Sequence, residues 1–171
     1  MKFENKSTKL TISLADNGMH SLTRGIQTYT AYSEKVDPML LKDAIMSLHH
    51  GIELLFKQIL VNTSPYLIFQ DLKDATSKQI KADQNNLAIF FLDSPPKTVN
   101  YEEAIMRIQA FVKAPELDPR LISKLKNLNQ LRNQLEHYAI DADIEDITKL
   151  INDIYPPLME FFEIYIPEIK T

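Results

Sequence analysis

The sequence predicts an all-α protein in which about five helices form an up-and-down bundle. Apolar residues recur at steps of three and four over most of the chain, which is the spacing of one helix face. Two Asp-Pro pairs and one Asn-Tyr-Glu-Glu string are typical helix starts. With only 3 glycines in 171 residues, a β-barrel and a glycine-rich phosphate loop are both disfavoured.

The first two helices are predicted from their starts and their apolar faces. Asp16 or Asn17 would cap the first helix, and the alternating residues 9–14 before it predict a short extended segment. An Asp-Pro pair at 37–38 starts the second helix, because proline fits the first helical position. The apolar faces would consist of Met19, Leu22, Ile26 and Tyr29 in the first helix, and of Leu41, Ile45, Leu48, Ile52, Leu55 and Ile59 in the second.

Residues 63–98 lack this helical spacing. The segments 65–70 and 86–93 have a strand-like composition, and a polar stretch separates them. A pair of prolines at 95–96 closes the region. The sequence therefore predicts a short irregular or β-hairpin-like insertion between the second and third helices.

Three further helices are expected after this insertion. Asn100 and Glu103 form a capping box for the third helix. The Asp-Pro pair at 118–119 starts the fourth, and Asp143 caps the fifth. The two prolines at 156–157 lie inside the fifth helix and should kink or break it.

Composition and charge bound the class of protein. The net charge is −4 and 44% of the residues are hydrophobic, which is typical of a globular chain. The absence of cysteine excludes disulfides, thiolate metal sites and cysteine nucleophiles. The longest apolar run, residues 87–92, is far shorter than the roughly twenty residues that a membrane span needs. We therefore expect one domain over residues 1–171, in the cytoplasm and not in a membrane.

The fourth helix carries the residues with the clearest chemistry. At about 100° per residue, Asn133 and His137 share one face, roughly opposite Leu135. Arg132 lies at the edge of the apolar stripe and reaches the same region only with its long side chain. We expect these side chains to converge on an outer surface, where a guanidinium, an amide and an imidazole can bind a phosphate and move a proton.

The string Arg132-Asn133-x-x-x-His137 resembles the RNxxxH signature of the HEPN family of helical ribonucleases. The second helix adds to the resemblance, because Glu53 and Lys57 are similar to the glutamate and lysine of the corresponding family helix. The resemblance implies an endoribonuclease that uses neither metal nor cofactor. The 2′-hydroxyl of the RNA would attack the phosphate and leave a 2′,3′-cyclic phosphate.

The resemblance also implies residue roles and a homodimer. His137 would act as general base or acid, Arg132 would hold the scissile phosphate, and Asn133 would orient His137 or a phosphate oxygen. Because one histidine cannot readily make both proton transfers, two motifs would face each other across one cleft. Further residues expected around the substrate are His50, Glu53, Lys57 and Tyr138.

The partners implied by the resemblance are RNA and, in a toxin–antitoxin or antiviral defence setting, an antitoxin or a nucleotidyltransferase. In toxins that a nucleotidyltransferase silences, the modified tyrosine lies in R-x4-H-x-Y. Here Tyr138 directly follows His137, so the sequence departs from that pattern. Residues 118–132 include four basic residues and one acidic residue, whereas residues 141–163 include seven acidic residues and one basic residue. This local basic charge suits an RNA contact.

Simpler interpretations remain for each of these residues. Arg132 could pair with Glu136 at i+4 beside an ordinary surface histidine, and Glu53 and Lys57 could form a surface pair. Adjacent histidines at 49–50 diverge by about 100° on a helix, so no metal site is expected there. The alternative functions are a non-catalytic HEPN module that binds RNA, a nucleotide or a protein, and an interaction bundle whose cleft is filled by side chains.

Overall fold

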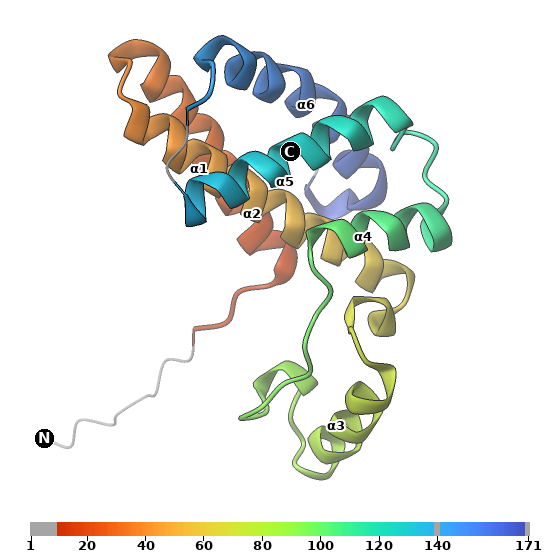
Figure 1. Ribbon diagram of the computed structural model, residues 1–171. Coiled ribbons are helices and arrows are strands. Elements are labelled where there is room, and N and C mark those ends of the chain that lie inside the picture. The colour runs from red at the N-terminus through yellow and green to blue at the C-terminus, as the bar shows by residue number, and fades with distance from the viewer. Residues whose placement is uncertain (1–9, 139–140, 170–171) are drawn as a thin grey trace, which may run out of the picture.

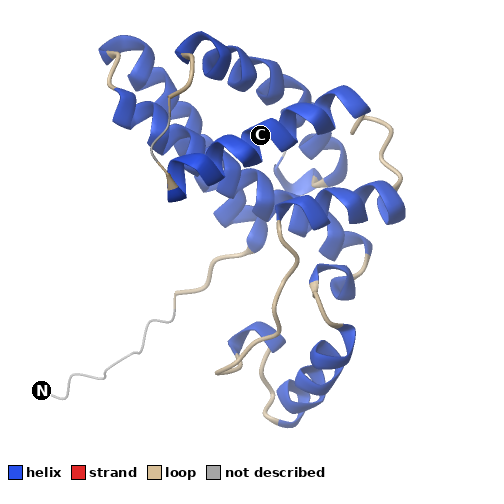
Figure 2. Ribbon diagram, in the orientation of Figure 1, coloured by secondary structure: helices blue, strands red, loops and turns tan. Residues whose placement is uncertain are grey.

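The computed structural model describes residues 10–138 and 141–169, and these residues form an all-α fold (Figures 1 and 2). The described part of the chain contains no β-strand, only one isolated antiparallel bridge between Phe69 and Thr98. The α-helices are α1 (Leu14–Lys35), α2 (Pro38–Thr63), α3 (Leu72–Gln84), α4 (Tyr101–Arg107), α5 (Pro119–His137) and α6 (Ile144–Tyr165). Shorter turns are η1 (Pro65–Ile68), η2 (Ile89–Phe91), the π-helical η3 (Ile108–Val112) and η4 (Pro167–Ile169).

Most of the predicted helix starts are confirmed. At four of the five predicted helix starts, the side chain of the predicted cap accepts a hydrogen bond from a backbone N–H in the first turn. These caps are Asp37, Asn100, Asp118 and Asp143. The first helix is the exception: its cap is Ser13 and not Asp16 or Asn17, so Leu14 is already helical.

Residues 63–98, predicted to be an irregular or β-hairpin-like insertion, contain no β-hairpin, and helix α3 within them was not predicted. Both strand-like segments form short 3₁₀ turns instead. Helix α3 occupies the polar stretch between them and starts at Asp71, whose carboxylate accepts from the N–H groups of Lys73 and Asp74. It buries only Ala75 and Ala82, so it has no apolar stripe of the usual kind.

The two prolines at 156–157 do not break α6, which continues through them to Tyr165. Buried residues lie on both sides of the proline pair. They include Ile151, Ile154, Leu158, Phe161 and Phe162. The packing of both halves against the core stabilises the helix where the backbone loses hydrogen bonds.

Helix α2 is the centre of the bundle and contacts α1, α4 and α5 (Figure 1). Its closest neighbour is α1, and all three glycines of the chain, Gly18, Gly25 and Gly51, lie at the crossing of these two helices. A Cβ atom added to Gly51 would lie 2.6 Å from the backbone nitrogen of Leu22. The glycines therefore permit a close backbone approach, in addition to lowering helix propensity.

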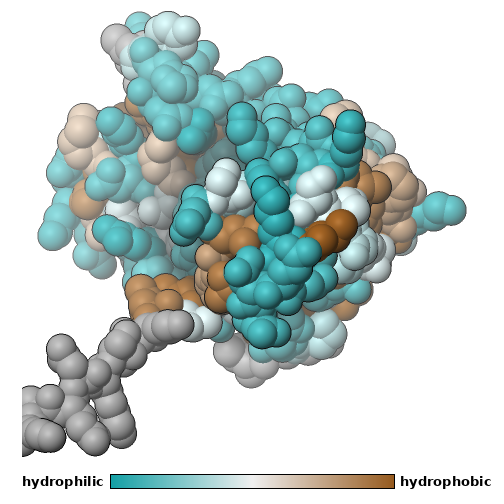
Figure 3. Space-filling view, turned by 90° about the horizontal axis from the view of Figure 1, so that it is seen from below, coloured by the Kyte–Doolittle hydropathy of each residue, from teal (hydrophilic) through white to brown (hydrophobic). Residues whose placement is uncertain are grey.

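Residues 65–98 form an arm that projects from the bundle (Figure 1). Arg107 of α4 fixes its base, because its Nη1 donates to the carbonyl oxygens of Leu67 at 2.6 Å and Phe69 at 2.8 Å. Figure 3 views the molecule from the end where the arm projects and shows a mostly hydrophilic face with separate apolar patches. Exposed apolar residues of the arm are Tyr66, Leu72, Ile80, Leu87, Phe90 and Phe91. Among the described residues, no helix has the length and apolar character that crossing a membrane requires.

Candidate functional site

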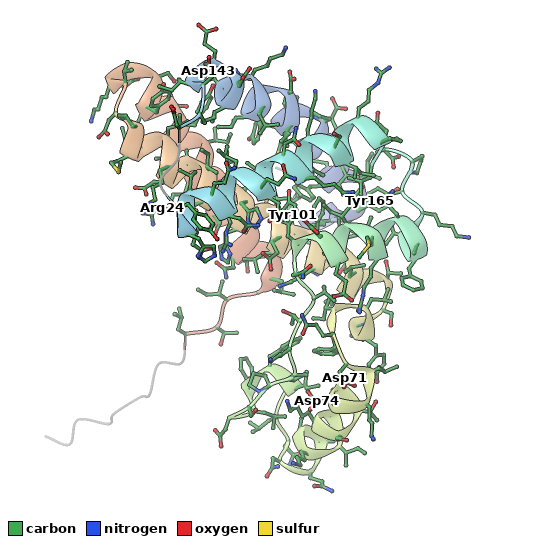
Figure 4. All side chains as sticks on the ribbon, viewed as in Figure 1. Arg24, Asp71, Asp74, Tyr101, Asp143 and Tyr165 are labelled. Atoms are coloured by element: carbon green, nitrogen blue, oxygen red, sulfur yellow. The ribbon has the colours of Figure 1, made fainter. Side chains whose placement is uncertain are left out.

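A polar cleft opens where α2, α4 and α5 meet. Its volume is about 440 Å³, which lies in the size range of small-molecule sites. Figure 4 shows Tyr101, one of its residues, at the start of α4 beside α5. The cleft is lined by His49, Glu53, Asn100, Tyr101, Glu102, Asn129, Arg132 and Asn133.

A hydrogen-bonded chain of three side chains connects the three helices. The His49 Nε2 and Asn129 Oδ1 atoms are 2.9 Å apart, and the Asn129 Nδ2 donates to Glu102 Oε1 at 2.9 Å. His49 is 4% exposed and Asn129 is 9% exposed, so their polar atoms depend on this chain for hydrogen bonds. Burial lowers the pKa of His49, which favours its neutral form.

Tyr101 forms one wall of the cleft behind His49. Its ring stacks on the imidazole with a centroid separation of 4.3 Å. Its hydroxyl is the only fully buried side-chain N or O atom without a hydrogen-bond partner among the described residues. Burial, with a smaller contribution from the Glu53 carboxylate, raises the pKa of Tyr101 well above its ordinary value. The phenol therefore stays protonated.

The structure brings two of the three predicted catalytic residues into the cleft and leaves the third outside. Arg132 and Asn133 both line the cleft, and Arg132 Nη1 donates to Asn133 Oδ1 at 3.0 Å. The guanidinium also pairs with Glu136, as the simpler interpretation expected. His137 is not a lining residue: its side chain is 60% exposed and its Nε2 lies 3.5 Å from Glu136 Oε2.

The other predicted residues divide in the same way. Glu53 lines the cleft and pairs with Lys57 at 2.7 Å, but this is not a simple surface pair, because Lys57 is 8% exposed. Lys57 also donates to Thr98 at 3.1 Å and so connects α2 with the end of the arm. His50 is exposed and does not line the cleft, and Tyr138 is 76% exposed at the C-terminal end of α5.

The sequence interpretation missed the roles of His49, Tyr101, Glu102 and Asn129. One signal was present: His49 and Asn129 each follow a buried leucine of an apolar stripe, where a buried polar side chain needs a partner. What the sequence could not indicate was that these two residues, 80 positions apart, would be partners.

The charge of the cleft is mixed and not basic. Glu53 and Glu102 are its acids and Arg132 is its cation, with Lys57 just behind Glu53. Of the other basic residues of α5, Lys124 pairs with Asp153 of α6 at 3.0 Å. Within the part of the chain that the structure describes, no three His, Asp or Glu side chains are grouped so that they could hold a metal ion.

Comparisons of the chain with family models, with curated proteins and with solved structures found no match. The geometry of the cleft is therefore the basis for a functional proposal. A cation, an amide and a neutral imidazole lie around one opening, and together they can bind an oxyanion and accept a proton.

Proposed function

We propose that this chain is a HEPN-type endoribonuclease that cleaves RNA without metal or cofactor and acts as a homodimer. The observation that carries the proposal is the position of Arg132 and Asn133 at one polar cleft, on the helix that ends in His137. A guanidinium can hold a phosphate through two parallel hydrogen bonds and can stabilise the charge that develops during phosphoryl transfer.

The chemistry follows from the available groups. The cysteine-free chain offers no thiolate, and the motif contains no serine or threonine. The nucleophile is therefore the 2′-hydroxyl of the substrate, which RNA has and DNA lacks. Attack on the adjacent phosphate expels the 5′-oxygen and leaves a 2′,3′-cyclic phosphate.

The position of His137 is the reason that the proposal includes a dimer. In one copy its side chain is 60% exposed and lies outside the cleft that contains Arg132, so a complete site requires His137 of a second copy. A closed two-fold arrangement would place two such motifs opposite each other. The setting that this proposal favours is the cytoplasm, in a toxin–antitoxin or antiviral defence system with an antitoxin or nucleotidyltransferase partner.

A second candidate function is a non-catalytic HEPN module that binds RNA, a nucleotide or a protein at the same cleft. The observation that favours it is that Arg132 pairs with Glu136 and lines a cleft together with Glu53 and Glu102. These carboxylates weaken the attraction of the cleft for a phosphate, so among the partners of such a module they favour a protein over RNA or a nucleotide.

Cleavage of labelled single-stranded RNA in EDTA separates the two candidates. We expect the wild type to cut, and Arg132→Ala and His137→Ala each to reduce the rate by about 10²-fold or more while the helical circular dichroism is unchanged. Lys81→Ala is the control for the loss of one positive charge, because Lys81 is exposed on α3 of the arm and does not line the cleft. Its rate should equal that of the wild type.

Two further tests address the nucleophile and the dimer. A single 2′-deoxy substitution should block cutting at that nucleotide. Mixing inactive Arg132→Ala and His137→Ala chains should restore part of the activity, because a mixed dimer contains one site with both residues intact. Cutting of the deoxy substrate, or a strict requirement for divalent metal, would contradict the mechanism. Binding of RNA without any cleavage would favour the non-catalytic module.

A further inference from the structure

The hydrogen-bonded chain at the cleft fixes the tautomer of His49. The ionised carboxylate of Glu102 can only accept, so the amide nitrogen of Asn129 must face it. The amide oxygen of Asn129 then faces His49, and an oxygen can only accept. The His49 Nε2 atom is therefore the donor. In the neutral ring, this leaves the lone pair on Nδ1.

The other ring nitrogen, Nδ1, makes none of the hydrogen bonds found among the described residues. His49 is only 4% exposed, but it is a lining residue of the cleft, so Nδ1 is the ring nitrogen that is left for a ligand of the cleft. A basic lone pair thus lies at the same opening as the Arg132 guanidinium.

Several charged groups face this imidazole. Burial is the largest influence on its pKa and lowers it, and Arg132 of α5 and His50 of α2 lower it further. The hydrogen bond to Asn129 and the charge of Glu53 on α2 act in the opposite direction. On α4, Tyr101 stacks on the ring and Glu102 lies beyond Asn129. The balance favours a neutral ring, which is the form that accepts a proton.

We propose that His49 is a second catalytic histidine of the cleft, whose Nδ1 accepts the proton of the 2′-hydroxyl while Arg132 holds the adjacent phosphate. This inference rests on the proposed function and extends it, because it assigns the two proton transfers to different residues. Asn129 and Glu102 are positioning residues, because they act by holding the His49 tautomer.

In the proposed reaction, one proton moves to His49 and another is supplied by His137. The 2′-oxygen forms a bond to phosphorus as its proton passes to Nδ1 of His49. The bond between phosphorus and the 5′-oxygen breaks, and the 5′-oxygen leaves with a proton from His137 of the second copy. The products are a 2′,3′-cyclic phosphate and a 5′-hydroxyl, and both histidines return to their starting states by exchange with water.

The decisive variant exchanges the amide and the carboxylate of the chain: Asn129→Asp combined with Glu102→Gln. Every hydrogen bond is preserved, because the new amide at position 102 would donate to the new carboxylate at position 129, and His49 Nε2 would still donate to that carboxylate. The net charge is unchanged, but the negative charge moves next to the imidazole and raises its pKa. The acidic limb of the rate profile should move upward by about one pH unit. The ring nitrogens of His49, followed by ¹⁵N NMR, should titrate upward with it.

A second variant removes the base but keeps the donor. In His49→Gln the side-chain amide can still donate to Asn129, and the rate should fall about 10²-fold or more. Asn127→Asp, at an exposed position on α5 outside this cleft, is the matched control for the added acid and should leave the profile unchanged.

A binding experiment keeps this inference separate from the proposed function. In His137→Ala protein, a ribo-oligonucleotide should shift the His49 Nδ1 resonance, and the 2′-deoxy oligonucleotide of the same sequence should not. Two results would overturn the role of His49 and leave the ribonuclease proposal intact. One is an active enzyme in which the amide–carboxylate exchange does not move the acidic limb of the rate profile. The other is a His49 ring that carries its proton on Nδ1 when no oligonucleotide is bound. If the wild type cuts no RNA, the ribonuclease proposal fails. The role of His49 in recognising the 2′-hydroxyl then survives only if the ribo-specific shift is seen, and its absence would overturn both.

Discussion

Replacing Gly51 with alanine tests whether the close approach of α1 and α2 determines the stability of the bundle. The added Cβ would lie 2.6 Å from the backbone nitrogen of Leu22, 2.9 Å from the carbonyl oxygen of Gly18 and 3.0 Å from the Leu22 Cα. All three neighbours are backbone atoms, so no side-chain rotation can relieve the contact. The two helices must move apart.

Two opposing contributions determine how much Gly51→Ala changes the free energy of unfolding. Alanine improves helix propensity by about 1 kcal/mol over glycine. Overpacking of a close-packed core costs about 1–3 kcal/mol and sometimes more. The cost should be at the upper end here, because α1 and α2 share the most extensive contact in the protein. We expect a net loss of about 2 kcal/mol in the free energy of unfolding, or roughly 4–8 °C in melting temperature.

Gly18→Ala is the matched control. Its Cβ would meet Leu55 side-chain atoms at 2.8 and 2.9 Å, and its nearest backbone neighbour is 3.3 Å away. A side chain can shift more readily than a backbone, so this variant should lose less stability than Gly51→Ala. Denaturant unfolding of both proteins measures the difference. Equal stabilities, or a Gly51→Ala protein more stable than the wild type, would refute the close approach of the two helices.

Two further variants test the buried residues of the cleft. Tyr101→Phe should raise the free energy of unfolding by about 1 kcal/mol, because it removes a buried hydroxyl that has no hydrogen-bond partner. If denaturant titration shows a loss of stability instead, the hydroxyl does have a hydrogen-bond partner. The wild type should lose stability as the pH falls below about 6.5, because burial lowers the pKa of His49 and the unfolded chain takes up this proton first. Unfolding curves at about pH 7.5 and 5 should show a smaller loss for His49→Gln, and equal losses would contradict a buried neutral His49.

Features that depend on neighbouring residues in the chain could be predicted from the sequence. The four confirmed caps belong to this class, because each cap side chain bonds to a backbone N–H only two or three residues away. Helix α3 could not be predicted in this way. It buries two alanines, and its other apolar residues, Leu72 and Ile80, are exposed, so no apolar stripe marks it.

Features that depend on tertiary contacts were mispredicted or missed. The proline pair at 156–157 weakens α6 locally, but buried residues on both sides hold the helix against the core. In the cleft, too, the tertiary contacts could not be predicted from the sequence. The position of Arg132 and Asn133 follows from their places on one helix, whereas the pairing of His49 with Asn129 depends on which faces of α2 and α5 meet.

The ion pair between Arg132 and Glu136 is compatible with phosphate binding because it is partly exposed. The side chains are 30% and 36% exposed, and pairs at such positions contribute at most about 1 kcal/mol. A phosphate that offers two oxygens to the guanidinium can therefore displace Glu136 at little cost, whereas breaking a fully buried pair would cost about 3–5 kcal/mol.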